Sequence, residues 1–165
     1  LRIPNRSIKV VFRQAVWDFF KDKVDNACVR DLVNALWAGK VENATAALSQ
    51  ILEATLSFYH EYHEYSYHLI LDGFFTGFGY RVLSELETGY GRSDLIILDP
   101  ERKRSMILEL GHVEKGKKME VALNKASSQM IENKYESRLK YGGYTVRLKY
   151  GMAFRDKRCM IERIS

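Results

Sequence analysis

The alternation of apolar and polar residues divides the chain into a helical first part and a mixed second part. In the first part, apolar residues recur at a spacing near 3.6 residues, which is typical of helices with one buried face. Asn43 or Thr45 is suited to cap the N-terminus of the helix predicted over residues 41–60. Helices are predicted over residues 7–37 with a second stretch from about 29, over 41–60, and over 61–77.

From residue 80 onward the pattern changes to short apolar runs separated by turn residues such as Gly89–Gly91 and the Gly142–Gly143 pair. The order of elements is three strands, one helix and two strands, which indicates an α/β fold with a mixed central sheet flanked by helices. A soft boundary near residue 58 separates a helical extension, residues 1–58, from a sheet-bearing domain, residues 59–165. Strands are predicted over residues 80–87, 92–99, 104–110, 144–156 and 158–164, and a helix over 117–140.

Composition and charge narrow the class of protein. The 165 residues are 46% hydrophobic, which suits one domain with a helical extension. No apolar run approaches the ~18 residues of a membrane span, and the first residues lack the apolar core of a signal peptide. Cys28 and Cys159 have no metal-type spacing and fit a reducing compartment, so we expect a cytoplasmic protein without a membrane partner. The net charge of +5 permits a polyanionic partner.

Histidines and glutamates gather in residues 59–68, YHEYHEYSYH, but their spacing argues against a zinc protease. The motif HExxH would need a histidine at position 67 or 64, where the chain has Tyr67 and Glu64. What remains is a helical face with His60, Glu64 and His68 at intervals of four. Either this is a half-exposed amphipathic helix, or Glu64 points toward a cation.

Two acids stand at the ends of neighbouring apolar strands. Asp94 begins one strand and Glu109 ends the next, and a hairpin around residues 100–103 would bring them to the same end of the sheet. Two carboxylates held close together repel each other unless a divalent cation lies between them. From spacing alone, a metal site and two ordinary acids facing water remain equally open.

The stretch GYGRSDLIILDPERKRSMILELG, residues 89–111, resembles the PD-(D/E)xK nuclease superfamily. Within it, the chain is similar to the branch found behind an AAA-type ATPase-like domain, and residues 1–12 resemble the segment that leaves that domain. The resemblance covers most of the chain and is densest over residues 59–155. It implies a restriction-endonuclease-like fold, and it implies an upstream ATPase-like domain in a longer protein.

The resemblance also implies roles for single residues. The metal, Mg²⁺ or Mn²⁺, would be held by the positions that match the family's ligands, which are Asp94, Glu109, the carbonyl of Leu110, and Glu64 on the preceding helix. Ser93 replaces the proline of the family's name. The polar positions of the following helix are matched by Gln129 and Tyr135, and Arg92 and Tyr135 are expected to contact nucleic acid.

The chain departs from the family pattern at Gly111, where the pattern Glu-x-Lys has its lysine. Glycine cannot balance phosphate charge or activate water, and it weakens a strand interior. Three explanations stay open: catalysis has been lost, the residue is an engineered substitution, or another lysine has taken over. Lys125 lies on the same helical face as Gln129 and is the candidate for the third, whereas strand alternation turns His112 to the opposite face.

The function that these observations favour is metal-dependent hydrolysis of phosphodiester bonds in nucleic acid, with DNA as the expected substrate, disabled if Gly111 has no substitute. The alternatives are a non-catalytic nucleic-acid-binding module and a protein-interaction module, each attached to an ATPase. Whether the chain is an active enzyme and whether it forms a homo-oligomer both stay open.

Overall fold

A computed structural model gives the fold of the chain. It describes residues 11, 14–15, 18–19, 21–56, 62–87, 92–113, 116–132 and 143–165. Within these ranges, the side chains of residues 84–87, 92–94, 129–132 and 146–147 lie outside the description.

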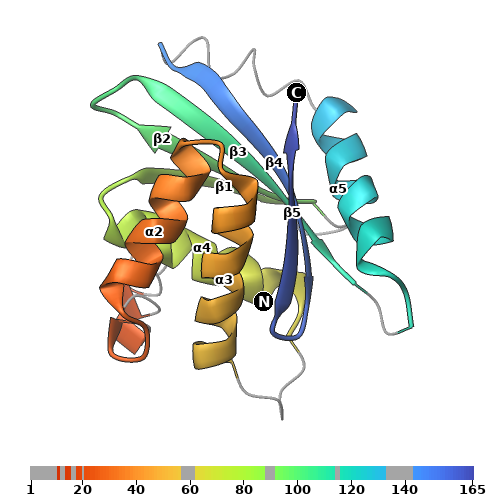
Figure 1. The fold of residues 1–165 in the computed structure, drawn as a ribbon. Helices are drawn as coiled ribbons and strands as arrows, with labels where there is room; N and C mark the ends of the chain where they lie inside the picture. The colour runs from red at the N-terminus through yellow and green to blue at the C-terminus, as the bar shows by residue number, and fades with distance from the viewer. Residues whose placement is uncertain are drawn as a thin grey trace.

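A five-stranded mixed sheet forms the centre of the molecule, with its strands in the order β1-β2-β3-β4-β5 (Figure 1). All neighbouring strands are antiparallel except β3 and β4, which are parallel. Parallel neighbours need a crossover, and α5, Met119–Glu132, supplies it. The strands are β1 Arg81–Glu87, β2 Arg92–Asp99, β3 Arg104–His112, β4 Thr145–Arg155 and β5 Arg158–Ile164, so the five predicted strands and the α/β fold class are confirmed.

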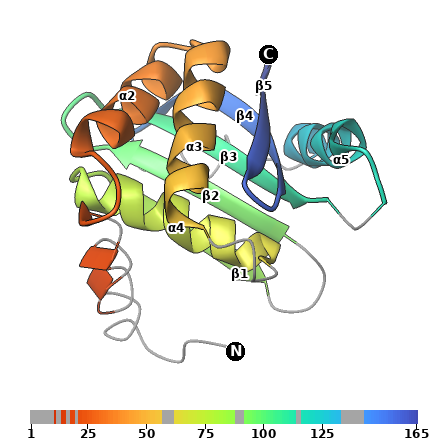
Figure 2. The ribbon, with the colours of Figure 1, turned by 60° about the horizontal axis from the view of Figure 1, so that its bottom comes forward.

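Helices cover both faces of the sheet. α2 (Asn26–Trp37), α3 (Val41–Thr55) and α4 (Glu64–Gly77) share one hydrophobic core with one face. α5 packs on the other face, and Figure 2 shows it apart from the other three helices. The alternation of β3 explains this division, because its even-numbered residues Met106, Leu108 and Leu110 join the larger core. Val113, which follows β3 at an odd position, joins the α5 cluster.

The helix ends differ from the expected ones. α3 begins at Val41 directly after Lys40, and the hydroxyl of Thr45 donates to the Val41 carbonyl inside the helix, so the predicted cap at Asn43 or Thr45 is wrong. The first helical segment is interrupted at residues 22–25, earlier than the predicted start of the second stretch near residue 29. α2 begins there because the Asp25 carboxylate accepts a hydrogen bond from Ala27 N at 2.9 Å and caps the helix. Residues 57–61 and 133–142, which end two predicted helices, lie outside the described residues.

Specific contacts tie α2 to the sheet. The buried hydroxyl of Tyr150 on β4 donates to the Leu36 carbonyl at 2.6 Å. The Arg104 guanidinium lies 4.1 Å from the Trp37 ring centre and pairs with Asp99 at 2.8 Å. Burial alone would raise the pKa of Asp99, but the hydrogen bond from Arg104 and a backbone N–H bond outweigh it and hold the pKa below its ordinary value. The described helices of the first part therefore share the core of the sheet. None of the helices among the described residues is long and apolar enough to cross a membrane.

Candidate active site

The β2–β3 hairpin brings the two strand-end acids together. Asp94 is the register partner of Glu109, as the sequence predicted. Asp94 occupies the same face of β2 as Ile96, and Glu109 the same face of β3 as Ile107, and these two isoleucines pack in one cluster. The Glu109 side chain is completely buried, whereas that of Asp94 lies outside the described ones. The two positions therefore lie on the side of the sheet on which α5 packs, at one end of the β2–β3 hairpin.

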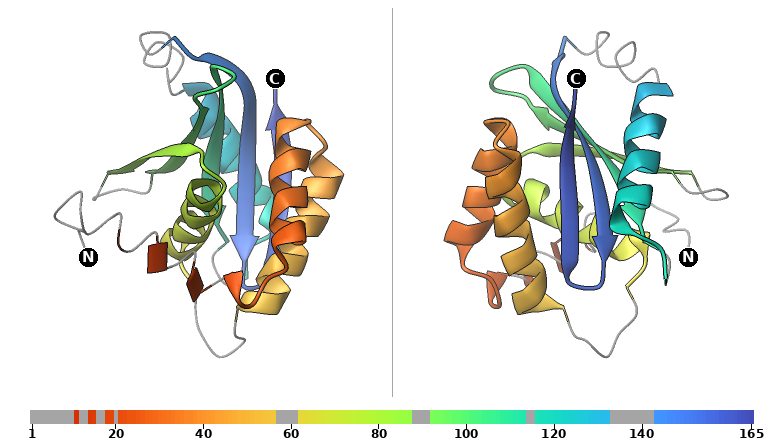
Figure 3. Two further views of the ribbon diagram at one scale, coloured as in Figure 1. Left: turned by 90° about the vertical axis from the view of Figure 1, so that its left-hand side faces the viewer. Right: turned by 45° about the vertical axis from the view of Figure 1, so that its right-hand side comes forward.

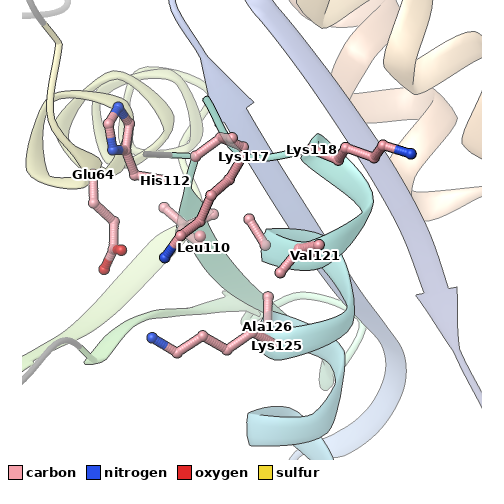
Figure 4. A pocket seen from close by; sticks show the side chains of 11 residues that line it. Glu64, Leu110, His112, Lys117, Lys118, Val121, Lys125 and Ala126 are labelled. Carbon is pink, nitrogen blue, oxygen red and sulfur yellow. The ribbon is translucent and has the colours of Figure 1, made fainter. Parts of the chain in front are cut away.

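A small pocket opens beside these acids, at the C-terminal end of β3 between α4 and α5 (Figure 4). Its volume is about 130 Å³. Four predicted site positions meet there, because the lining includes Glu64, Leu110, Gly111 and Lys125. Glu109 directly precedes Leu110 on β3 and is not a lining residue. The remaining lining residues are His112, Val113, Lys117, Lys118, Val121, Ala122 and Ala126.

The charged side chains of the pocket are not oriented alike. In Figure 4 the Glu64 carboxylate and the ammonium groups of Lys117 and Lys125 all point toward the side of the pocket near Leu110, and Lys118 points away. Glu64 is the first residue of α4, where a negative charge interacts favourably with the helix dipole. The sequence indicated Lys125 as a site residue and did not indicate Lys117. The signal in the sequence was that Lys117 stands at the start of the helix predicted over residues 117–140, next to the end of β3.

Gly111 lies directly under the backbone of α5. A Cβ atom at this position would stand 3.0 Å from the Ala122 carbonyl oxygen, which is closer than ordinary van der Waals contact. The neighbouring strand repeats the arrangement, because a Cβ at Gly151 would stand 2.6 Å from Ser127 Oγ. Gly111 therefore has a structural reason: it allows the backbone of α5 to approach the sheet closely, and any side chain at this position would press on that backbone.

The other face of β3 carries aromatic contacts. His112 faces α4, as strand alternation predicted, and its ring lies 6.4 Å from Tyr67 and 6.3 Å from His63 between centroids. It still lines the pocket together with Glu64, which the sequence did not predict. Burial raises the pKa of Tyr67, whose hydroxyl donates to the Asp156 carbonyl at 2.8 Å. His68, one helical turn after Glu64, is buried in the core. Of the predicted His60–Glu64–His68 face, Glu64 thus reaches the pocket, His68 is in the core, and His60 lies outside the described residues.

Several predicted site atoms are not placed. The side chains of Arg92 and Gln129 lie outside the description, as does the whole of Tyr135. Among the side chains that are described, no group of three or more histidines, cysteines, aspartates or glutamates is arranged to hold a metal ion. The side chain of Asp94 is not among those described, so the predicted acid pair stays a prediction at the level of side chains.

A mixed sheet flanked by helices, with an acid pair on neighbouring strands and a helix acid at the adjoining pocket, defines a restriction-endonuclease-like domain. A family model of the PD-(D/E)XK nuclease superfamily matches residues 62–164, which is more than half of the chain. The chain belongs to this superfamily of nucleases. The match does not extend to a branch behind an ATPase-like domain. No curated protein and no solved structure gave a significant match.

Members of this superfamily generally use divalent metal ions. The donors at the expected positions are carboxylate and carbonyl oxygens, which suit Mg²⁺ and Mn²⁺.

Proposed function

We propose that this chain hydrolyses phosphodiester bonds of nucleic acid, with DNA as the preferred substrate, and that Lys125 supplies the positive charge that the family pattern places at position 111. One observation carries the proposal. Lys125 and Glu64 line the same pocket at the end of β3, beside the Asp94–Glu109 register pair, while the α5 backbone at Ala122 leaves no free room for a Cβ at Gly111. The resemblance to nucleases and the geometry of the pocket thus converge on the same place.

Asp94, Glu109, Glu64 and the carbonyl of Leu110 would hold Mg²⁺ or Mn²⁺ in this proposal. A bound ion of this kind polarises phosphate oxygens and lowers the pKa of a bound water. The carboxylates of Asp94 and Glu109 repel each other, and a bound cation would offset this repulsion. Glu64 would add a third carboxylate from α4, at the edge of the pocket.

The ammonium of Lys125 would donate a hydrogen bond to a non-bridging phosphate oxygen and stabilise the charge that grows there as the bond breaks. Lysine suits this role because its ammonium is a compact point charge on a flexible stem. Val121, Ala122 and Ala126 give the pocket an apolar wall on the side of α5. That wall limits water around the reacting group and strengthens the electrostatic contact.

The size of the pocket favours a polymer over a free nucleotide. A volume of about 130 Å³ is well below the roughly 300–1,000 Å³ of pockets that enclose a drug-sized ligand. The pocket suits a phosphate group with a hydrated ion, while the rest of the substrate lies on the surface outside it.

The test compares the cleavage of plasmid DNA, linear DNA and RNA in Mg²⁺, Mn²⁺ or EDTA. Changing Lys125→Gln should lower the cleavage rate by about 10²–10⁴-fold, the usual contribution of a positioned acid-base or charge-stabilising group. Lys118→Gln is the matched control, because it removes the same charge from the same pocket lining but its side chain points away (Figure 4). The control should stay within a few-fold of the unaltered chain, and Asp94→Asn should abolish cleavage.

Equal rates for the Lys125→Gln and Lys118→Gln chains would refute the role of Lys125. A second candidate function is non-catalytic nucleic-acid binding, which is favoured by the glycine at position 111. It predicts metal-independent binding with no cleavage by the unaltered chain under any of these conditions, and that result would replace the proposal of hydrolysis.

The proposal includes an upstream ATPase-like domain, connected through the helices of residues 1–58. Support comes from the contacts of α2 with the sheet, where Tyr150 bonds to the Leu36 carbonyl and Arg104 lies over Trp37. A displacement of α2 would therefore act directly on β3 and β4. Cleavage by the full chain with Tyr150→Phe, which removes the hydrogen bond to the Leu36 carbonyl, compared with the unaltered chain, measures whether this contact of α2 acts on the site.

A further inference from the structure

We propose that the nucleic-acid strand leaving the pocket crosses the start of α5 and lies in a second groove at the β4–β5 turn, where arginine side chains bind its phosphates. This inference rests on the proposed function for the identity of the polymer. It adds a binding surface outside the pocket, and it sets the direction in which the substrate runs across the protein.

The β4–β5 hairpin places two positive charges opposite each other. Arg155 and Arg158 are register partners at the end of the hairpin, joined by a turn of only two residues. Like charges directly opposite on antiparallel strands destabilise the pair. The turn itself adopts a demanding conformation, with Asp156 at a φ of 51°. A bound anion would offset the repulsion of the arginines, so the hairpin has the charge arrangement expected of an anion-binding element.

A groove of about 500 Å³ lies at this turn. It is lined by the cations Arg155, Lys157 and Arg158 and by the carboxylates Glu53 and Asp156. The Lys157 ammonium donates to the Glu53 carbonyl oxygen at 3.2 Å, which anchors the turn to α3. With three cations and two carboxylates, the groove keeps a net positive charge, and Arg158 is exposed at its surface.

The groove adjoins the pocket through a direct contact. Nη1 of Arg155 donates to the carbonyl oxygen of Lys117 at 3.4 Å, and Lys117 lines the pocket. A second contact joins the same turn to α4, because the Tyr67 hydroxyl bonds to the Asp156 carbonyl. In the right-hand view of Figure 3 the β4–β5 turn and the start of α5 lie at the same end of the molecule. The hydrogen bond from Arg155 therefore places the groove next to a residue that lines the pocket, and in the proposal Lys117 and Arg155 form the path between the two sites.

Phosphodiester backbone is the ligand chemistry that fits this path. The pocket accommodates a single phosphate, whereas the path continues beyond it with cations at successive positions. A strand held in this way releases counterions from each phosphate that is neutralised, so its affinity should fall with salt concentration. Each phosphate contact contributes about 0.9 to the slope of log affinity against log salt on duplex DNA, and about 0.7 on single strands.

The test measures this slope for duplex DNA, single-stranded DNA and single-stranded RNA of one sequence. Titrations use the Asp94→Asn chain in EDTA, so that no strand is cut and no metal is required. Adding Arg158→Gln should lower the slope by about 0.7–0.9 on the substrate that is bound. Arg102→Gln is the matched control, because Arg102 is also an exposed turn arginine but lies in the β2–β3 turn, at the far end of β3 from the pocket.

The free protein gives an independent readout. Because Arg158→Gln removes a like-charge pair, it should raise the melting temperature slightly, so that weaker binding cannot be explained by unfolding. A slope unchanged by Arg158→Gln, or lowered equally by Arg102→Gln, would overturn the path, as would the absence of binding to all three substrates. If the slope falls as expected and the unaltered chain cuts nothing in Mg²⁺ or Mn²⁺, the path stands and hydrolysis is refuted.

Discussion

Replacing Gly111 with alanine tests whether this glycine exists for the close approach of α5. The added Cβ would stand 3.0 Å from the Ala122 carbonyl oxygen, so the helix must move away by a few tenths of an ångström. Overpacking in a well-packed interior costs about 1–3 kcal/mol. Alanine also lowers the entropy of the unfolded chain, which returns about 0.4–1 kcal/mol. We therefore expect a net loss of about 1–2 kcal/mol.

Thermal and urea unfolding of the two chains measure this loss. For a domain of this size, 1 kcal/mol corresponds to about 2–4 °C in melting temperature, so Gly111→Ala should melt about 2–8 °C lower. Because the contact is with a backbone oxygen, Ala122→Gly should not restore the lost stability. A Gly111→Ala chain as stable as the original would show that α5 is not held against Gly111.

The same contact determines what a lysine at this position can do. Gly111→Lys carries the Cβ of alanine and a longer side chain, so it should be at least as destabilised as Gly111→Ala. If Lys125 already supplies the charge, the added lysine should not raise the rate of cleavage. A large gain in cleavage by the Gly111→Lys chain would show instead that the strand position is the functional one.

Two further predictions concern packing and pH. Gly151→Ala should destabilise the fold because its Cβ would stand 2.6 Å from Ser127 Oγ, and thermal unfolding should show partial recovery when Ser127→Ala is added, since the contacting atom is then absent. No recovery would contradict this cause. Asp99 has a pKa held below its ordinary value of 3.8, so its contribution is complete above pH 3.8 and is lost as the pH falls through the lowered value. The difference in melting temperature between the original chain and Asp99→Asn should therefore be larger at pH 7 than at acidic pH, and a constant difference would contradict it.

The strands and their pairing could be predicted because local signals agree. Each strand is a short apolar run bounded by turn residues, and the turn at residues 100–103 is short enough to set the register of β2 on β3. That register alone placed Asp94 opposite Glu109. The face of His112 followed from the two-residue period of a strand. These features depend on neighbours that are close in sequence.

The missed features depend on contacts between distant residues. Asn43 and Thr45 have the side chains of good caps, but α3 begins earlier, at Val41, so both residues lie inside the helix. The purpose of Gly111 was not visible, because the atom that excludes a side chain belongs to Ala122 on α5. No motif in the sequence singled out Lys117, which lines the pocket because the fold brings the start of α5 beside α4 and the end of β3.

The glycine at position 111 and the lysine at position 125 are consequences of one packing arrangement. Gly111 and Gly151 lie on neighbouring strands, and their lack of side chains allows the backbone of α5 to approach the sheet more closely than larger residues would permit. That approach leaves little room for a Cβ at position 111 and, at the same time, places Lys125 in the lining of the pocket that Glu64 also lines. A larger residue at position 111 would push α5 outward and carry Lys125 with it. The two positions should therefore be coupled, so that a change at Gly111 affects cleavage through the placement of Lys125 as well as through the stability of the fold.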